Sequence, residues 1–205
     1  MLDACKPTPP MAVAAIERET RAVGFTMASD AWTGSLLRSL AASKPGGLFL
    51  ELGTGTGLAT AWLLDGMDER STLLSVDDDE AVVSIARRNL AHDARVTFTV
   101  ADGASQIALL VAEHRSFDLI FADTWPGKYT HLEEALQLVR VGGLYVVDDM
   151  LPQANWPDDH PPKVESLVEA LTSRPDFHVA TLSWSTGLIL ATRVRRVESP
   201  CGAAA

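Results

Sequence analysis

Cysteine is scarce in this sequence, and the two cysteines present, Cys5 and Cys201, lie near its ends. Two residues so placed give neither a disulfide framework nor the ligand spacing of a zinc site. The sequence also lacks any run of about 18 apolar residues, the length that a membrane-spanning helix needs. Residues 1–10 lack the basic and then apolar layout of a secretory signal peptide. We therefore expect a cytoplasmic protein with no membrane partner.

Positive charge is in short supply as well. There are 17 lysines and arginines against 27 aspartates and glutamates, which gives a formal net charge of −10. A nucleic-acid backbone or an anionic membrane surface binds to a basic face of a protein. The only visible basic cluster, Arg193 with Arg195 and Arg196, has the pattern of a strand end. We therefore expect no nucleic acid among the partners.

The length of 205 residues fits one domain of ordinary size, and no linker or internal repeat divides it. We predict a single domain over residues 11–197, a disordered tail over residues 1–10 and a second tail over residues 198–205. The proline-rich stretch 152–162 is predicted to be a surface loop that could act as a lid.

Short apolar runs alternate with helical patterns from residue 48 onward. Strands are predicted at 48–52, 72–76, 96–100, 117–122 and 144–147, with a final hairpin of 177–182 and 187–192. Helices are predicted at 11–23, 30–44, 58–66, 79–90, 103–111, 130–139 and 162–172. Near-continuous apolar strands separated by helices indicate a mostly parallel sheet covered on both faces. The predicted fold is α/β, a Rossmann-like doubly wound sheet with a C-terminal antiparallel hairpin.

The first predicted strand runs into three glycines at every second position, Gly53, Gly55 and Gly57. Glycines at a strand–helix turn let the backbone approach a ligand closely. The dinucleotide fingerprint would require a third glycine at position 58, which is Leu58. The acid before the turn, Glu51, would repel a pyrophosphate but suits a cation. S-adenosylmethionine is the cationic cofactor of this kind, and we predict that it contacts Glu51, Gly53, Thr54, Gly55 and Gly57.

Carboxylates follow the later strands, where ligands of open parallel sheets bind. Asp77 is predicted to accept both ribose hydroxyls of the cofactor, or else to cap the next helix. Asp78 is placed to face the adenine, whereas Asp79 is predicted to be a cap. Asp102 either accepts from the adenine amino group or caps the helix that starts near Gly103.

These motifs resemble those of the class I S-adenosylmethionine-dependent methyltransferases. Within that class, the chain is most similar to the cation-dependent O-methyltransferases of the catechol and caffeoyl-CoA type. The resemblance covers about residues 29–192 and rests on segments 50–53, 75–77, 103–106, 117–123 and 141–149. It implies that Gly103 and Ala104 lie near the adenine, and that two copies of the chain form a homodimer.

The resemblance also implies a divalent metal ion, Mg²⁺, bound by Asp123, Asp148 and Asp149. Three converging carboxylates would repel one another without a cation, and oxygen ligands suit Mg²⁺. The alternative is that Asp148 or Asp149 binds backbone amides while Asp123 holds the cofactor's ammonium. The family usually has Asp-Asn where this chain has Asp148-Asp149.

The predicted reaction is an in-line transfer of the cofactor's methyl group to a hydroxyl of a small molecule. Asp123 and Lys128 are the predicted catalytic residues, although Pro126 and Gly127 displace the lysine from the family's position. Other candidate bases are His131, which is otherwise a surface residue, and His160 in the proline-rich loop.

Aromatic residues are candidates for a wall against a planar acceptor, or else for ordinary packing. They are Trp125, Trp156 and Trp184. Met27 and Ser29 are placed to close over the methionine moiety. The competing interpretations are a non-catalytic cofactor-binding module, an NAD(P)-dependent oxidoreductase, and a methyltransferase acting on nitrogen or on a macromolecule.

Overall fold

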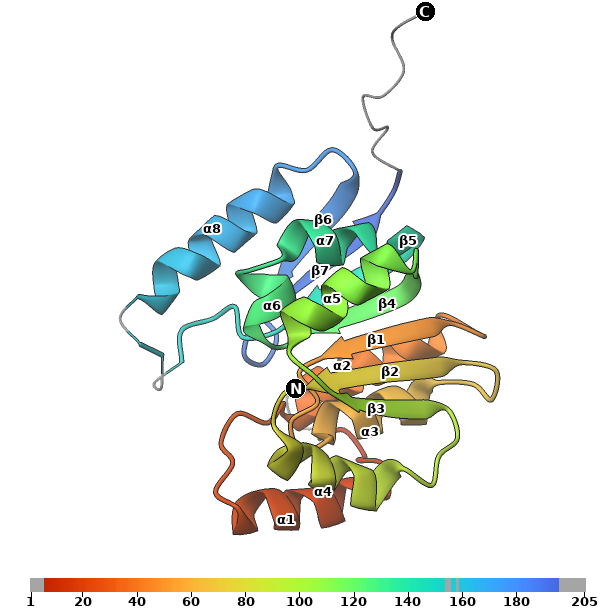
Figure 1. Ribbon diagram of the computed structural model, residues 1–205. Helices are drawn as coiled ribbons and strands as arrows, with labels where there is room; N and C mark the ends of the chain where they lie inside the picture. Colours follow the sequence, from red (N-terminus) through yellow and green to blue (C-terminus); the bar gives the residue numbers. More distant parts are fainter. Residues whose placement is uncertain (1–5, 154–155, 158, 196–205) are drawn as a thin grey trace, which may run out of the picture.

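The computed structural model describes residues 6–153, 156–157 and 159–195 (Figure 1). Its seven strands form one sheet in the order β3-β2-β1-β4-β5-β7-β6. Their bounds are β1 Leu48–Leu52, β2 Thr72–Asp77, β3 Val96–Val100, β4 Phe117–Ala122, β5 Val139–Val147, β6 Phe177–Leu182 and β7 Leu188–Arg193. The first five strands are parallel, and β7 runs antiparallel to both β5 and β6. The predicted fold class is confirmed.

Helices cover both faces of this sheet (Figure 1). One face carries α1 Val13–Ala22, α2 Ala31–Ala42, α3 Leu58–Gly66 and α4 Glu80–Leu90. The other carries α5 Gly103–Ala112, α6 Trp125–Lys128, α7 Leu132–Gln137 and α8 His160–Thr172. Each face buries its own hydrophobic cluster, because the strands present alternate side chains to the two faces. Phe49 packs in the first cluster, and its neighbour Leu50 packs in the second.

The strand register sets where a ligand can bind. Leu52 at the end of β1 lies opposite Val76 of β2 and opposite Ala122 of β4. Ala122 in turn lies opposite Val147, the last residue of β5. These strands therefore end level with one another, and the loops that follow them meet at one edge of the sheet.

The region between β4 and β5 differs most from the sequence-based expectation. The predicted helix 130–139 is only α7, a single short helix, and the separate turn of α6 precedes it. The fifth strand begins at Val139 rather than at residue 144, and its pairing with β4 shifts register on the way. The expected N-terminal tail is described only from Lys6, and the tail 198–205 and both cysteines lie outside the described residues.

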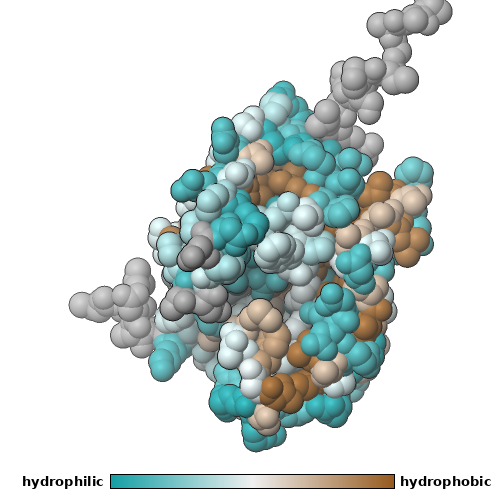
Figure 2. All heavy atoms as spheres, turned by 60° about the vertical axis from the view of Figure 1, so that its left-hand side comes forward, coloured by the Kyte–Doolittle hydropathy of each residue, from teal (hydrophilic) through white to brown (hydrophobic). Residues whose placement is uncertain are grey.

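The described surface is mixed in character. On the face drawn in Figure 2, hydrophobic residues form separate patches among hydrophilic ones. Within residues 6–153, 156–157 and 159–195, no helix is both long and apolar enough to cross a membrane.

Candidate functional site

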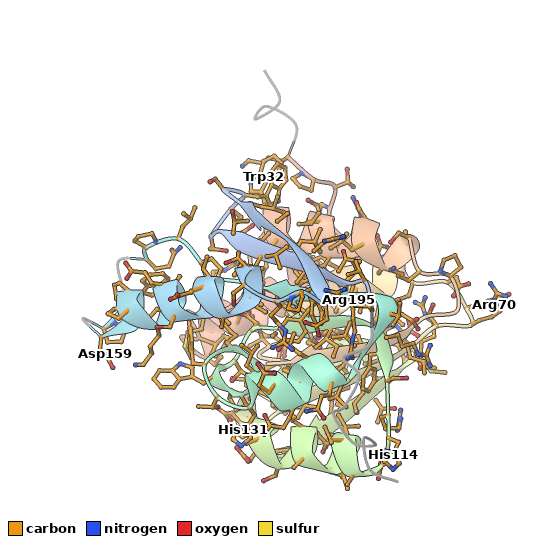
Figure 3. The ribbon with its side chains drawn as sticks, turned by 90° about the horizontal axis from the view of Figure 1, so that it is seen from above. Trp32, Arg70, His114, His131, Asp159 and Arg195 are labelled. Atoms are coloured by element: carbon orange, nitrogen blue, oxygen red, sulfur yellow. The ribbon has the colours of Figure 1, made fainter. Side chains whose placement is uncertain are left out.

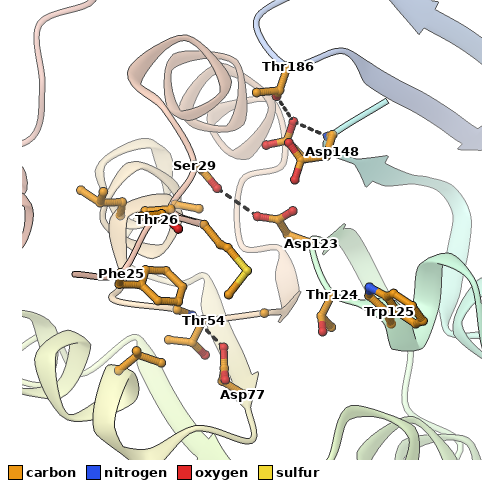
Figure 4. A pocket seen from close by; sticks show the side chains of 18 of the residues that line it. Phe25, Thr26, Ser29, Thr54, Asp77, Asp123, Thr124, Trp125, Asp148 and Thr186 are labelled. Carbon is orange, nitrogen blue, oxygen red and sulfur yellow. Dashed lines mark hydrogen bonds between the residues drawn. The ribbon is translucent and has the colours of Figure 1, made fainter. Parts of the chain in front are cut away.

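A cleft of about 570 Å³ opens beyond the carboxyl ends of the central strands (Figure 4). One side is formed by the loop after β1 and by Asp77–Asp79, and the other by the segments that follow β4 and β5. Residues 25–30, which lead into α2, close over it. A smaller pocket of about 270 Å³ adjoins the cleft and includes Asp102 and Gly103 in its lining.

The glycine loop turns its backbone toward the cleft. Gly53 has a φ of 102°, and a Cβ there would lie 2.9 Å from the backbone oxygen of Asp123. The amide of Gly55 donates to Asp77 Oδ2 at 2.8 Å, and Thr54 is buried between the two glycines. Gly53, Thr54 and Gly55 all line the cleft, as predicted for cofactor-binding residues.

Gly57 contributes to helix packing. It begins α3 with a φ of 92°, and a Cβ on it would approach the Cβ of Ala86 to 2.7 Å. It is absent from the described linings of the cleft and of the smaller pocket. The structure thus places Gly57 where α3 packs against α4, rather than in contact with a ligand.

The three acids that follow β2 have different positions and hydrogen bonds. Asp77 and Asp78 line both the cleft and the smaller pocket. Asp79 caps α4 by accepting from the amide of Ala81 at 2.8 Å, which confirms its predicted role. Asp77 is half-buried, and it also accepts from the amide of Asp79 at 3.0 Å.

Asp102 caps a helix, which is one of the two alternatives considered for it. Its carboxylate caps α5, accepting from the amide of Ser105 at 2.9 Å and from its hydroxyl at 2.8 Å. These hydrogen bonds lower the pKa of Asp102. Asp102 and Gly103 also border the smaller pocket, whereas Ala104 lines neither described space.

Glu51 lies elsewhere than predicted. It is fully buried and lines neither the cleft nor the smaller pocket. The alternation of the strand turns its side chain to the face that α3 covers, where it accepts from Thr60 Oγ1 at 2.6 Å and from Ser75 Oγ at 2.5 Å. Burial raises the pKa of Glu51 to about 7. The expectation of a direct cofactor contact by Glu51 is therefore corrected.

Asp123 and Lys128 meet on the opposite side of the cleft. Lys128 Nζ lies 3.9 Å from Asp123 Oδ1, and the two side chains are 5% and 12% exposed. The intervening chain doubles back, since Pro126 is extended and Gly127 has a φ of 95°. This kink returns the displaced lysine to the cleft. Ser29 donates to Asp123 Oδ2 at 3.2 Å (Figure 4).

Asp148 and Asp149 also line the cleft. Asp148 is buried and accepts from the hydroxyl of Thr186 and from the amide of Asp149. Burial and the nearby Asp148 carboxylate raise the pKa of Asp123 well above its usual value. Burial, with a contribution from Asp149, raises the pKa of Asp148 to about 6.

The predicted metal site is not assembled by these carboxylates. Within the part of the chain that the structure describes, no group of three or more His, Cys, Asp or Glu side chains is arranged to hold a metal ion. One oxygen of Asp148, Oδ1, accepts both from the hydroxyl of Thr186 and from the amide of Asp149, and the cation beside Asp123 is Lys128.

Aromatic side chains flank the acceptor side of the cleft. Tyr129 Oη lies 2.9 Å from His160 Nε2, and the ring of Trp156 lies 4.3 Å from that of His160. Trp125 contacts Tyr129 edge to face at 6.0 Å. All four residues line the cleft. Burial and the charges of Lys128 and Lys163 lower the pKa of His160.

Two other predicted candidates lie outside the cleft lining. His131 is exposed at the periphery of the molecule (Figure 3), which agrees with its interpretation as a surface residue. Trp184 packs edge to face on Trp32 at 5.4 Å, and it is absent from the described linings. Met27 and Ser29 do line the cleft, and their closure over the methionine moiety stays a prediction.

Sequence reasoning missed several lining residues. Phe25 and Thr26 lie in the segment before α2, and Thr186 comes from the turn between β6 and β7 (Figure 4). The pairing of Tyr129 with His160 joins positions 31 residues apart. No local pattern marks these contacts, because they depend on how distant loops fold over the sheet edge.

Comparison with known proteins gives consistent matches. Residues 50–150 match the family described as a methyltransferase domain. A probable O-methyltransferase of Mycobacterium tuberculosis is 32% identical over 118 residues, which cover 56% of this chain and 52% of that protein. The chain thus spans about half the length of this curated relative.

Solved structures resemble nearly the whole chain. A methyltransferase from Geobacter sulfurreducens is 25% identical with a TM-score of 0.75, and 94% of this chain aligns with 95% of that one. The O-methyltransferase TomG from Streptomyces achromogenes, in complex with S-adenosylmethionine, is 22% identical with a TM-score of 0.80. That alignment covers 95% of this chain and 94% of TomG, and it supports the fold.

Proposed function

We propose that this chain, whose residues 50–150 match a methyltransferase domain family, is an S-adenosylmethionine-dependent O-methyltransferase of small molecules. One observation carries the proposal. A single cleft joins the glycine loop and Asp77 on one side to Asp123, Lys128 and an aromatic cluster on the other. Such an arrangement can hold a cofactor and an acceptor facing each other.

The cofactor side suits a cationic nucleoside without phosphates. In the proposal, Asp77 accepts the ribose hydroxyls, and the backbone of Gly53–Gly55 lies against the methionine part. The smaller pocket, with Asp78, Asp102 and Gly103, takes the adenine. Carboxylates on this side favour a sulfonium and an ammonium over a pyrophosphate. This charge argument also disfavours the alternative of an NAD(P)-dependent oxidoreductase.

The acceptor side supplies proton transfer and charge. The proposed general base is Asp123, whose carboxyl lines the cleft beside Lys128 and whose pKa is raised by burial. The acceptor's hydroxyl proton passes to Asp123, and its oxygen attacks the methyl carbon. The carbon–sulfur bond breaks with its electron pair remaining on sulfur, which leaves S-adenosylhomocysteine. Lys128 stabilises the developing negative charge on the acceptor oxygen.

The predicted Mg²⁺ has no step in this mechanism. Among the described residues, no group of three or more His, Cys, Asp or Glu side chains is arranged to hold the ion, and Lys128 already stands beside Asp123. Tyr129, Trp156 and His160 would instead orient a planar acceptor by ring contacts. The homodimer and the cytoplasmic location remain predictions.

Turnover tests this proposal. Purified protein is incubated with methyl-labelled S-adenosylmethionine and a panel of planar phenols, with and without a chelator. We expect label in the acceptor and release of S-adenosylhomocysteine in both conditions. Cofactor binding without turnover on any hydroxyl acceptor would favour the non-catalytic binding module. Turnover that requires added Mg²⁺ would contradict the role given to Lys128.

A further inference from the structure

Glu51 is a buried carboxyl that the proposed mechanism does not use. Its Oε2 accepts from Thr60 Oγ1 in the first turn of α3 and from Ser75 Oγ on β2. Its Oε1 is buried and has no hydrogen-bond partner among the described residues. A buried carboxyl that is only partly satisfied destabilises a fold. Glu51 lies directly behind the glycine loop, so a role in holding the conformation of that loop would account for its burial.

A chain of hydroxyls connects Glu51 to the cleft. The Oγ atoms of Ser75 and Thr54 lie 2.6 Å apart. An ionised Glu51 can only accept, so Ser75 donates to it and receives the hydroxyl hydrogen of Thr54. Thr54 lines the cleft in the glycine loop (Figure 4). Two residues beyond Ser75 on the same strand, Asp77 holds the amide of Gly55.

We propose that Glu51 is a positioning residue for the cofactor, which holds the Gly53–Gly57 loop in its receptive conformation through Thr60 and the Ser75–Thr54 pair. This inference rests on the proposed function, since it assumes that the loop binds S-adenosylmethionine. It assigns to Glu51 an indirect role in place of the direct contact expected from the sequence.

If Glu51 positions the cofactor, its ionisation should make cofactor affinity depend on pH. A residue with a purely structural role would not produce this dependence. Around it, β2 contributes Ser75 and Asp77, α3 contributes Thr60, and Phe121 of β4 lies opposite in the sheet. The Asp77 carboxylate adds to burial in raising the pKa of Glu51 to about 7. Protonation weakens the hydrogen bonds that Glu51 accepts from Thr60 and Ser75, because a neutral carboxyl is a weaker acceptor than a carboxylate. Loss of its negative charge also weakens attraction for a cation, so cofactor affinity should rise as pH increases through about 7.

The test uses Glu51→Gln, Ser75→Ala and Thr60→Val. Calorimetry measures S-adenosylmethionine affinity from about pH 6 to about pH 8.5, a range that brackets the Glu51 titration. Hydrogen exchange measures protection of the 53–57 amides without cofactor. Ser71→Ala is the matched control. It also removes a buried hydroxyl, but from the residue just before the other end of β2, where it contacts Asp68 and Gly47.

We expect parent affinity to rise about threefold to tenfold with pH, and Glu51→Gln to abolish this dependence. Ser75→Ala and Thr60→Val should weaken affinity by about threefold to tenfold and speed exchange in the loop, as the loss of one hydrogen bond would. Ser71→Ala should change neither the cofactor affinity nor the exchange rates of the loop amides. The inference would be overturned if Glu51→Gln and Ser75→Ala both kept the cofactor affinity, the pH profile and the loop exchange rates of the parent protein. A parent that binds no S-adenosylmethionine would instead refute the proposed function, while the exchange data would still report on Glu51.

Discussion

The two sides of the cleft are built in different ways. The cofactor side consists of backbone in a glycine loop and of acids whose hydrogen bonds are made locally, such as Asp77 to Gly55 and Asp102 to Ser105. The acceptor side consists of side chains from separate segments, and its carboxyls Asp123 and Asp148 have raised pKa values. In the proposed function, binding would therefore depend on a preformed loop, whereas proton transfer would depend on buried carboxyls that repel one another.

Removing the cation of the acceptor side should have the largest effect. Lys128→Met takes away the positive charge beside Asp123 and should lower kcat by about 10³-fold, because Lys128 is the cation that the proposed mechanism places beside the acceptor oxygen. Cofactor affinity should stay near the parent value, as titration calorimetry can show. Lys163→Met is the control, since Lys163 stacks on Trp125 at 4.5 Å and pairs with Asp159 instead. Equal kcat in parent and Lys128→Met would remove Lys128 from the mechanism.

On the cofactor side, Asp77→Ala should weaken S-adenosylmethionine binding by about 100-fold. The variant loses the proposed ribose contacts and also the acceptor for the amide of Gly55. Circular dichroism should show an unchanged fold. In the control Asp79→Ala, only the cap of α4 is lost, and affinity should remain close to the parent's. Normal affinity in Asp77→Ala would take this residue out of the site.

The buried carboxyl of Glu51 should make the free energy of unfolding depend on pH. Its pKa is raised from 4.5 to about 7, so the folded state binds the proton more tightly than the unfolded state. Stability from this group is therefore complete below pH 4.5 and is lost as pH rises through about 7. Glu51→Gln should be more stable than the parent at pH 8 by about 2 kcal/mol, with little difference at pH 4.5. Urea unfolding at both pH values measures this, and the opposite ordering at pH 8 would contradict the burial argument.

The smallest effect is expected from Asp102→Ala. Loss of the cap on α5 should lower the free energy of unfolding slightly. Because Asp102 borders only the smaller pocket, cofactor affinity should fall less than in Asp77→Ala. Thermal unfolding measures the loss of stability, and calorimetry measures the loss of cofactor affinity. A larger loss of affinity than in Asp77→Ala would mean that the adenine, and not the ribose, dominates binding.

The same comparison explains how far the sequence predicts the molecule. The strands and the glycine loop follow from local patterns, and so does the capping by Asp79. The position of Glu51 differs from the cofactor contact expected for it, because strand alternation turns its side chain toward α3. The return of Lys128 depends on the kink at Gly127, and the contact of Tyr129 with His160 depends on a long loop. Neither leaves a periodic signal.

The central claim is that the cleft binds S-adenosylmethionine, and titration calorimetry of the purified protein tests it most directly. NAD serves as the control ligand, because its pyrophosphate should be repelled by the acids that line the cleft. The account predicts micromolar binding of S-adenosylmethionine and no heat from NAD. A folded protein that gives no heat with S-adenosylmethionine would contradict it.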